Sequence, residues 1–151
     1  MPQSYDISKI KQHPYLAVFD GTVLGPLADA PKIETDIEVF DSLIYENGGH
    51  EEVSRTITRA SAKITILTKN IDAALTLAGG FSRGTDIADP AARKVLAFTP
   101  ITESAGEKTL TFSAAVLLPE IEYVPAMGKD HVARLSFMAY PDAGGNLFTF
   151  A

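Results

Sequence analysis

Two neighbouring segments of this chain alternate apolar and polar residues over far more than the usual length of a β-strand. Residues 32–45 and 52–67 both show the period of two that places successive side chains on opposite faces of a strand. Strands in globular proteins usually have about five or six residues. Because Asn47-Gly48-Gly49 between the segments is typical of a turn, the sequence predicts one long hairpin that projects beyond a compact body.

The two strands of this hairpin have faces of different chemistry. The apolar face of the first strand, which we expect to pack in the core, consists of Ile33, Ile37, Val39 and Leu43. Its opposite face carries three carboxylates in a row, Glu34, Asp36 and Glu38. In the second strand the apolar phase shifts near residues 59–61, which indicates a β-bulge at that point.

The rest of the chain predicts further strands and one helix. A helix begins after Thr68 or Asn70 and ends at Gly79-Gly80, and strands are expected at residues 16–23, 94–101, 108–118, 120–124, 129–140 and 147–150. The helix presents an apolar stripe of Ile71, Ala74, Leu75 and Ala78. Two strands show regular apolar faces, Leu110, Phe112, Ala114, Val116 and Leu118 in one, and Ala133, Leu135, Phe137 and Ala139 in the other. We therefore expect a mainly β protein, an antiparallel β-sandwich or barrel of seven to eight strands with one flanking α-helix and the long projecting hairpin.

Length and composition favour a single domain. With 151 residues, 46% of them hydrophobic, the chain is long enough for one core, so we expect one domain over residues 1–151, with an extended arm at residues 1–14 and a hairpin tip at residues 40–53. The sequence has no apolar run of membrane-spanning length and no signal-peptide pattern, which predicts production in the cytoplasm and no membrane partner. A formal net charge of −6 argues against a broad phosphate-binding surface.

The chain offers few residues for catalysis or cofactor binding. It has no cysteine, and its three histidines lie far apart, with His50-Glu51-Glu52 the segment nearest to a metal-binding pattern. No G-x-S-x-G motif surrounds a serine, and residues 79–84 match no phosphate-binding loop. We expect no metal, no cofactor, no small-molecule substrate and no enzymatic activity.

The carboxylates of the hairpin, together with Glu120 and Glu122, allow three interpretations. Converging carboxylates bind calcium or perform acid-base chemistry in glycosidases. They also occur on ordinary solvated sheet faces. A third possibility is that they line a passage in which like charge prevents a polyanion from adhering to the wall.

Several segments predict self-association. Phe40, Ile44 and Tyr45 lie at or near the hairpin tip, and the chain ends in the apolar run of residues 147–150. Exposed strand edges and apolar patches usually mark contacts with other chains. We expect this protein to assemble with copies of itself.

The order of these segments resembles that of the phage tail tube proteins, or major tail proteins, a family related to the tube proteins of contractile injection systems. The similarity includes the strand-to-helix run of residues 63–80 and the ending of residues 135–148, a regular strand followed by Pro141-Asp142-Ala143-Gly144. It implies a structural virion protein of the tail, assembled in the host cytoplasm. In the family, the subunits form hexameric rings, and the rings stack into a tube through which DNA passes. Its implied partners are further copies, tape measure and terminator proteins, and DNA in transit.

The resemblance also assigns roles to individual residues. The candidates to line the lumen are Glu34, Asp36, Glu38, Glu120 and Glu122. The candidates for ring stacking are Phe40, Ile44, Tyr45, Asn47, His50 and Glu51. A tail terminator, a distal tail protein or a secretion-system tube subunit would share much of this pattern. A β-barrel that binds a small ligand is an alternative of another class, and it requires an interior apolar cavity.

Overall fold

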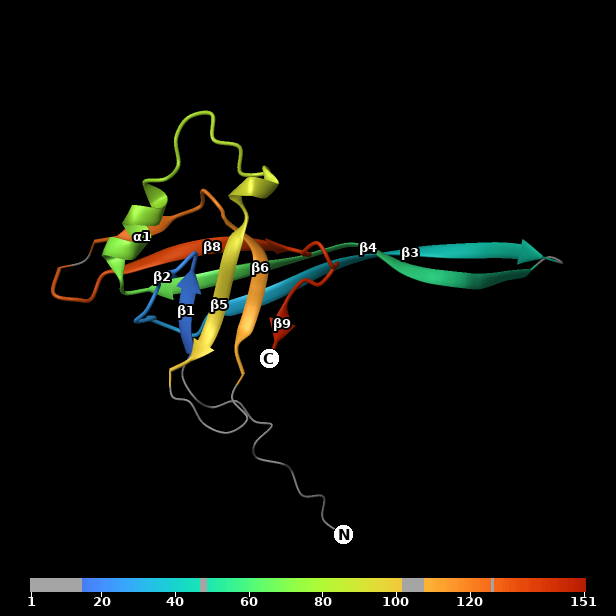
Figure 1. Ribbon diagram of the computed structural model, residues 1–151, viewed down its shortest axis with the longest axis horizontal. Coiled ribbons are helices and arrows are strands. Elements are labelled where there is room, and N and C mark those ends of the chain that lie inside the picture. Colours follow the sequence, from blue (N-terminus) through green and yellow to red (C-terminus); the bar gives the residue numbers. More distant parts are fainter. Residues whose placement is uncertain (1–14, 47–48, 102–107, 126) are drawn as a thin grey trace, which may run out of the picture.

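The computed structural model describes residues 15–46, 49–101, 108–125 and 127–151, and for residues 41–55 it describes the backbone but not the side chains. The elements in chain order are β1 (Tyr15–Phe19), β2 (Thr22–Val23), β3 (Lys32–Glu46), β4 (Gly49–Thr68), α1 (Ile71–Ala78), the 3-10 helix η2 (Pro90–Ala92), β5 (Lys94–Pro100), β6 (Leu110–Leu117), β7 (Glu122–Val124), β8 (Val132–Tyr140) and β9 (Thr149–Phe150). The mainly β architecture with one α-helix is confirmed (Figure 1).

The described residues form nine strands where the sequence predicts seven or eight, because the first predicted strand is divided by a turn. Asp20 and Gly21 have φ angles of 49° and 78°. Positive φ at both central residues is the geometry of the two-residue hairpin turn that suits strand twist. Val18 consequently pairs with Val23 across a short hairpin of β1 and β2.

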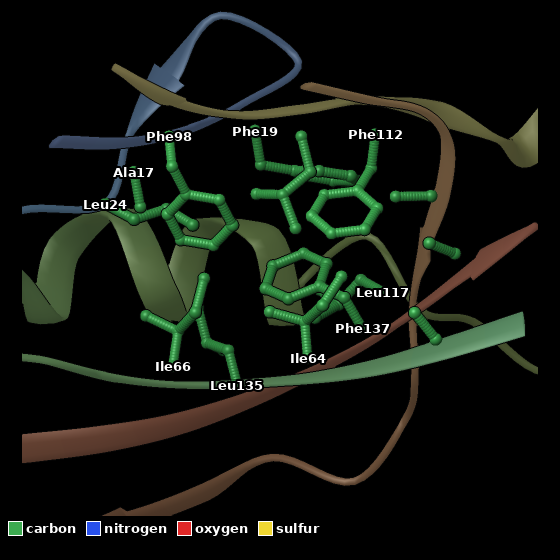
Figure 2. Packing of buried hydrophobic residues seen from close by; sticks show 14 of the residues in the cluster. Ala17, Phe19, Leu24, Ile64, Ile66, Phe98, Phe112, Leu117, Leu135 and Phe137 are labelled. Carbon is green, nitrogen blue, oxygen red and sulfur yellow. The ribbon is translucent and has the colours of Figure 1, made fainter. Parts of the chain in front are cut away.

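The strands form one antiparallel sheet in the order β2-β1-β5-β6-β8-β4-β3, with β7 added on β8 and β9 on β6. The sheet folds over at β6, whose first half pairs with β5 and whose second half pairs with β8. A register shift between Lys94 and Leu96 places a bulge in this strand, which lets it bend from one layer to the other. The layer of β1 and β5 thus lies over the layer of β4 and β8, as in a sandwich (Figure 2).

Four aromatic rings pack among aliphatic side chains in the core between the two layers (Figure 2). Phe19 of β1 lies 4.8 Å from Phe137 of β8, measured between ring centroids, and Phe98 packs edge to face on Phe112 at 6.4 Å. The predicted core face of β8 is confirmed, since all four of its residues, Ala133, Leu135, Phe137 and Ala139, are fully buried. These rings fill the space in which the ligand-binding barrel would hold its ligand.

The predicted core face of β6 is only half right. Phe112 and Val116 are buried as expected, but beyond Phe112 it is Ala115 and Leu117 that join the core cluster, whereas Ala114 is only half-buried. The bulge that bends β6 inserts one extra residue and reverses the alternation beyond it.

Helix α1 begins where Asn70 caps it, one of the two predicted positions. The Asn70 side chain accepts a hydrogen bond from the Ala73 backbone N–H at 3.3 Å and donates one to the Val23 carbonyl at 3.1 Å. Thr68, the other candidate, is buried; its hydroxyl donates to the Leu24 carbonyl and accepts from the Asn70 backbone N–H. These bonds attach the helix start to the β2 end of the sheet.

The apolar stripe of α1 is rotated relative to the prediction. Ala74 is fully buried, and Ile71 and Leu77 pack on the core, but Leu75 is 44% exposed. With only eight residues, the helix contacts the body along a narrow stripe, and Leu75 falls outside it.

The long hairpin of β3 and β4 extends well beyond the two layers (Figure 1). β8 pairs with β4 only from Ala62 to Thr68, so from Gly49 to Ser61 β4 pairs with β3 alone. At the usual rise per residue this two-stranded part, hereafter the ribbon, is about 40 Å long. Its register shifts between Glu38 and Val39, opposite Thr58, which confirms a bulge beside the predicted site at residues 59–61, and shifts again between Ser42 and Leu43.

Candidate assembly surfaces

Exposed apolar side chains lie on one face of the long hairpin and are here named the apolar strip: Ile33 just before the ribbon begins, and Ile37, Val39 and Ile57 on the ribbon itself. Their exposed fractions are 40%, 48%, 46% and 61%, respectively. Ile33 pairs with the fully buried Ile64, so the strip continues the core face of the sheet outward. The prediction that these β3 residues pack in the core is therefore wrong for the single chain, because the ribbon extends past the layer of β1 and β5 that would cover them.

An apolar depression of about 270 Å³ lies at the base of the strip. It is lined by Tyr15, Pro31, Ile33, Phe98, Leu110 and Phe150. Ile33 belongs to both surfaces, so the depression and the strip are continuous. This depression could not be predicted from the sequence because its lining comes from five separate parts of the chain, and only the sheet order brings them together.

The opposite face of the sheet is charged, and it carries both signs. The predicted row of Glu34, Asp36 and Glu38 does share one face of β3. Four basic side chains lie among the predicted carboxylates: Lys32 is 2.7 Å from Glu34, and three pairs are 3.7 Å apart, namely Arg59–Glu38, Lys63–Glu120 and Arg134–Glu122. Lys32 lies on the same strand as Glu34, whereas cross-strand pairing places Arg59 opposite Glu38 and Arg134 opposite Glu122, an arrangement that the sequence alone does not reveal.

The structure brings three of the five predicted lumen carboxylates together. Glu34, Glu120 and Glu122 line one shallow polar depression of about 450 Å³, which Lys63 and Arg134 also line. Asp36 and Glu38 lie farther out along β3 and do not line it. The five residues therefore occupy one charged face but not one cluster.

Electrostatic interactions on this face are weak because water surrounds them. The Lys32 side chain is 73% exposed and that of Glu34 57%. A hydrogen bond from Lys32, and then its positive charge, hold the pKa of Glu34 below its ordinary value. Pairs this exposed contribute little to folding and are screened by salt.

The predicted stacking residues are described only in part. Phe40 is 61% exposed and, by its even position, lies on the charged face rather than on the apolar strip. The backbone pairs Ile44 with Glu51 and Tyr45 with His50, but the side chains of these four residues lie outside the description. Asn47 and the arm of residues 1–14 lie outside the described residues.

Within the described part of the chain, no group of three His, Cys, Asp or Glu residues is arranged to hold a metal ion. His131 instead forms a hydrogen bond of 2.7 Å between its Nδ1 and the Tyr123 hydroxyl. A search of the same residues found no helix with the length and apolar character needed to cross a membrane.

Comparison with known proteins finds similarity in structure rather than in sequence. No family model and no curated protein matches the sequence. A chain in the tail of an empty gene transfer agent particle, with C6 symmetry, superposes with a TM-score of 0.53 at 18% identity, over 91% of this chain and 95% of that one. A chain in the sheath-tube complex of an extracellular contractile injection system gives 0.51 at 15%, over 96% and 95%. The fold is shared with tail and injection-system chains.

The sheath/tube terminator structure of that injection system contains a further similar chain, with a TM-score of 0.51 at 13% identity. The match covers 98% of each chain, so it extends over the hairpin as well as the two-layered body. The resemblance to tail tube and injection-system proteins that the sequence predicts is thus confirmed for the fold.

Proposed function

We propose that this protein is a structural subunit of a tail tube, whose rings stack into a channel through which DNA passes. It performs no reaction of its own. Its partners are further copies of itself and other tail proteins such as the tape measure and terminator proteins, and its location is the virion tail, assembled in the host cytoplasm. The observation that carries the proposal is the ribbon: a two-stranded hairpin about 40 Å long with an exposed apolar strip, in a fold shared with tail chains.

A two-stranded ribbon with one uncovered apolar face needs support from outside its own body. Isolated hairpins are marginally stable in water, and three or more strands or a packed face are usually required. β3 is the last strand in the sheet order, and among the described residues no strand pairs with its outer edge. Such an edge accepts a strand from another chain through main-chain hydrogen bonds.

Repetition of one such contact between identical subunits gives rings or open stacks. A head-to-tail contact forms a ring when the rotation from one subunit to the next returns to the first subunit, and otherwise it continues as a filament. Six subunits per ring is the number that the family resemblance implies, and the C6 symmetry of the similar gene transfer agent tail supports it. The arm of residues 1–14 and the tip of residues 40–53 belong to the stacking contacts in this proposal.

The charged face is the proposed lumen wall. Its carboxylates Glu34, Asp36, Glu38, Glu120 and Glu122 are interspersed with four cations, and no broad cationic surface arises among them. Phosphate-binding surfaces need clustered Lys and Arg, and each neutralised phosphate adds adhesion. A wall of alternating sign with an acidic excess lets DNA move without sticking.

The direct test is electron microscopy of the concentrated protein, with sedimentation velocity over a range of concentrations. We expect rings at low concentration and tubes of stacked rings at high concentration. A protein that remains a monomer throughout refutes the proposal.

A tail terminator is the second candidate, because one similar chain belongs to a sheath/tube terminator structure. A terminator forms a single ring and stops there, whereas a tube subunit continues to polymerise. Single rings that never stack, at any concentration, would therefore favour the terminator.

A further inference from the structure

We propose that the apolar strip of one copy packs in the apolar depression of the next copy. Each subunit then contacts one neighbour through its strip and another neighbour through its depression. The proposal rests on the tail-tube function and specifies the contact that joins its subunits. It places the main contact on the flank of the ribbon, at Ile37, Val39 and Ile57, rather than at the hairpin tip.

The two surfaces match in chemistry and complement each other in shape. The depression has an apolar lining from five strands and Pro31, and its volume of about 270 Å³ suits a few aliphatic side chains. The strip presents such side chains, between 40% and 61% exposed, on a narrow two-stranded support. Apolar surfaces of this kind are usually covered by another chain in the working assembly.

The strip that occupies a depression must belong to another copy, because the outer strip residues of one chain cannot reach the depression of the same chain. Ile37, Val39 and Ile57 lie on an extended ribbon that leads away from the body, and a paired strand cannot fold back on itself (Figure 1). Every copy carries both surfaces, so the depression of one copy can cover the strip of a second copy while the strip of the first copy remains available for a third. A contact between two different surfaces of the same chain propagates, as stacking requires.

The charged face does not compete for this role. Four of its five carboxylates, Glu34, Glu38, Glu120 and Glu122, already have cationic partners, including Arg59 for Glu38 on the ribbon itself. Apart from Phe40, the apolar side chains described on the ribbon lie on the strip face, so apolar attraction to another copy is concentrated on that face.

The absence of cysteine from the chain allows a direct crosslinking test. Ile37→Cys, Val39→Cys or Ile57→Cys in one preparation is mixed with Phe150→Cys in another, under assembling conditions, and the mixture is oxidised. A disulfide requires the two Cα atoms to lie within about 7 Å. Thr56→Cys, next to Ile57 on the opposite face of the ribbon, is the matched control for the strip, and Val95→Cys, an exposed apolar position on β5, is the control for the depression.

We expect at least one strip variant to form a covalent heterodimer with Phe150→Cys, at a yield several-fold above that of either control. Tubes that assemble without this crosslink overturn the inference while leaving the tail-tube function intact. The same holds if strip variants crosslink only with themselves, since that indicates a two-fold contact between strips. A strictly monomeric protein overturns the function and the inference together.

A second measurement guards against misfolded variants. Ile37→Lys should abolish tubes, and Thr56→Lys, which adds the same charge on the other face, should leave them intact. Both should retain the far-UV circular dichroism spectrum of the parent protein. Tubes formed normally by Ile37→Lys would contradict the proposal.

Discussion

Replacement of Ile57 by serine should separate the stability of the subunit from the stability of its assembly. Ile57 is 61% exposed in the single chain. Full burial of an isoleucine is worth about 1.5 to 3 kcal/mol, so the covered part contributes about 1 kcal/mol or less to folding. The exposed part supplies about 1 to 2 kcal/mol when a neighbouring copy covers it.

An assembly loss of this size is easy to measure. It corresponds to a roughly 5- to 30-fold rise in the concentration at which tubes first form, because about 1.4 kcal/mol is a factor of ten. The critical concentration is obtained from pelleting over a dilution series, and subunit stability from urea unfolding below that concentration.

Thr56→Ser is the matched control for this experiment. It removes β-branching at the neighbouring residue of the same strand, on the charged face, and so repeats the loss of strand propensity without touching the strip. We expect its critical concentration to stay within twofold of the parent value. Equal shifts for the two variants, or no shift for Ile57→Ser, would refute a role of the strip in assembly.

Three further predictions concern the body and the charged face. Phe137→Ala should lower the free energy of unfolding by about 3 to 5 kcal/mol in urea titrations, since the ring is fully buried between the layers, whereas Met138→Ala on the half-buried opposite face should cost at most about half as much. Asn70→Ala should cost about 1 kcal/mol in the same assay through loss of the helix cap; a change below about 0.3 kcal/mol would contradict the capping role. Lys32→Met should raise the pKa of Glu34 toward its ordinary value in an NMR titration, because Lys32 supplies the hydrogen bond and charge that lower it. Since the folded pKa is lowered, the contribution of Glu34 to stability is present above its unfolded pKa and is lost as pH falls through the folded pKa.

Strands covered on one face by the chain itself could be predicted from the sequence. Leu135 and Phe137 in β8 and Ile64 in β4 alternate without interruption, and all three are buried. The phase of β6 could not be predicted beyond Phe112, because Ser113-Ala114-Ala115 consists of small residues that suit either face. The bulge there follows from the bend of the sheet between its layers, which is a tertiary requirement.

Apart from the Lys32–Glu34 pair within β3, the placement of cations opposite carboxylates on the charged face depends on register and was therefore hidden from the sequence. An unbroken ladder from the Glu46–Gly49 pair would place Ser61 opposite Glu34. The two register shifts in the hairpin bring Lys63 there instead. A positive residue thus lies opposite a carboxylate that, taken along its own strand, appears only as part of an acidic row.

The apolar strip shows what a period of two does and does not establish. Ile33, Ile37 and Val39 share one face of β3, as the buried residues share one face of β8, yet each is at least 40% exposed in the single chain. Alternation indicates that one face of a strand is shielded from water, but it does not indicate which molecule provides the shield. Where a strand extends beyond its own core with this pattern intact, its apolar face is left for another chain to cover. The exposed apolar face of the hairpin is therefore better explained by the proposed assembly than by the folding of the single subunit.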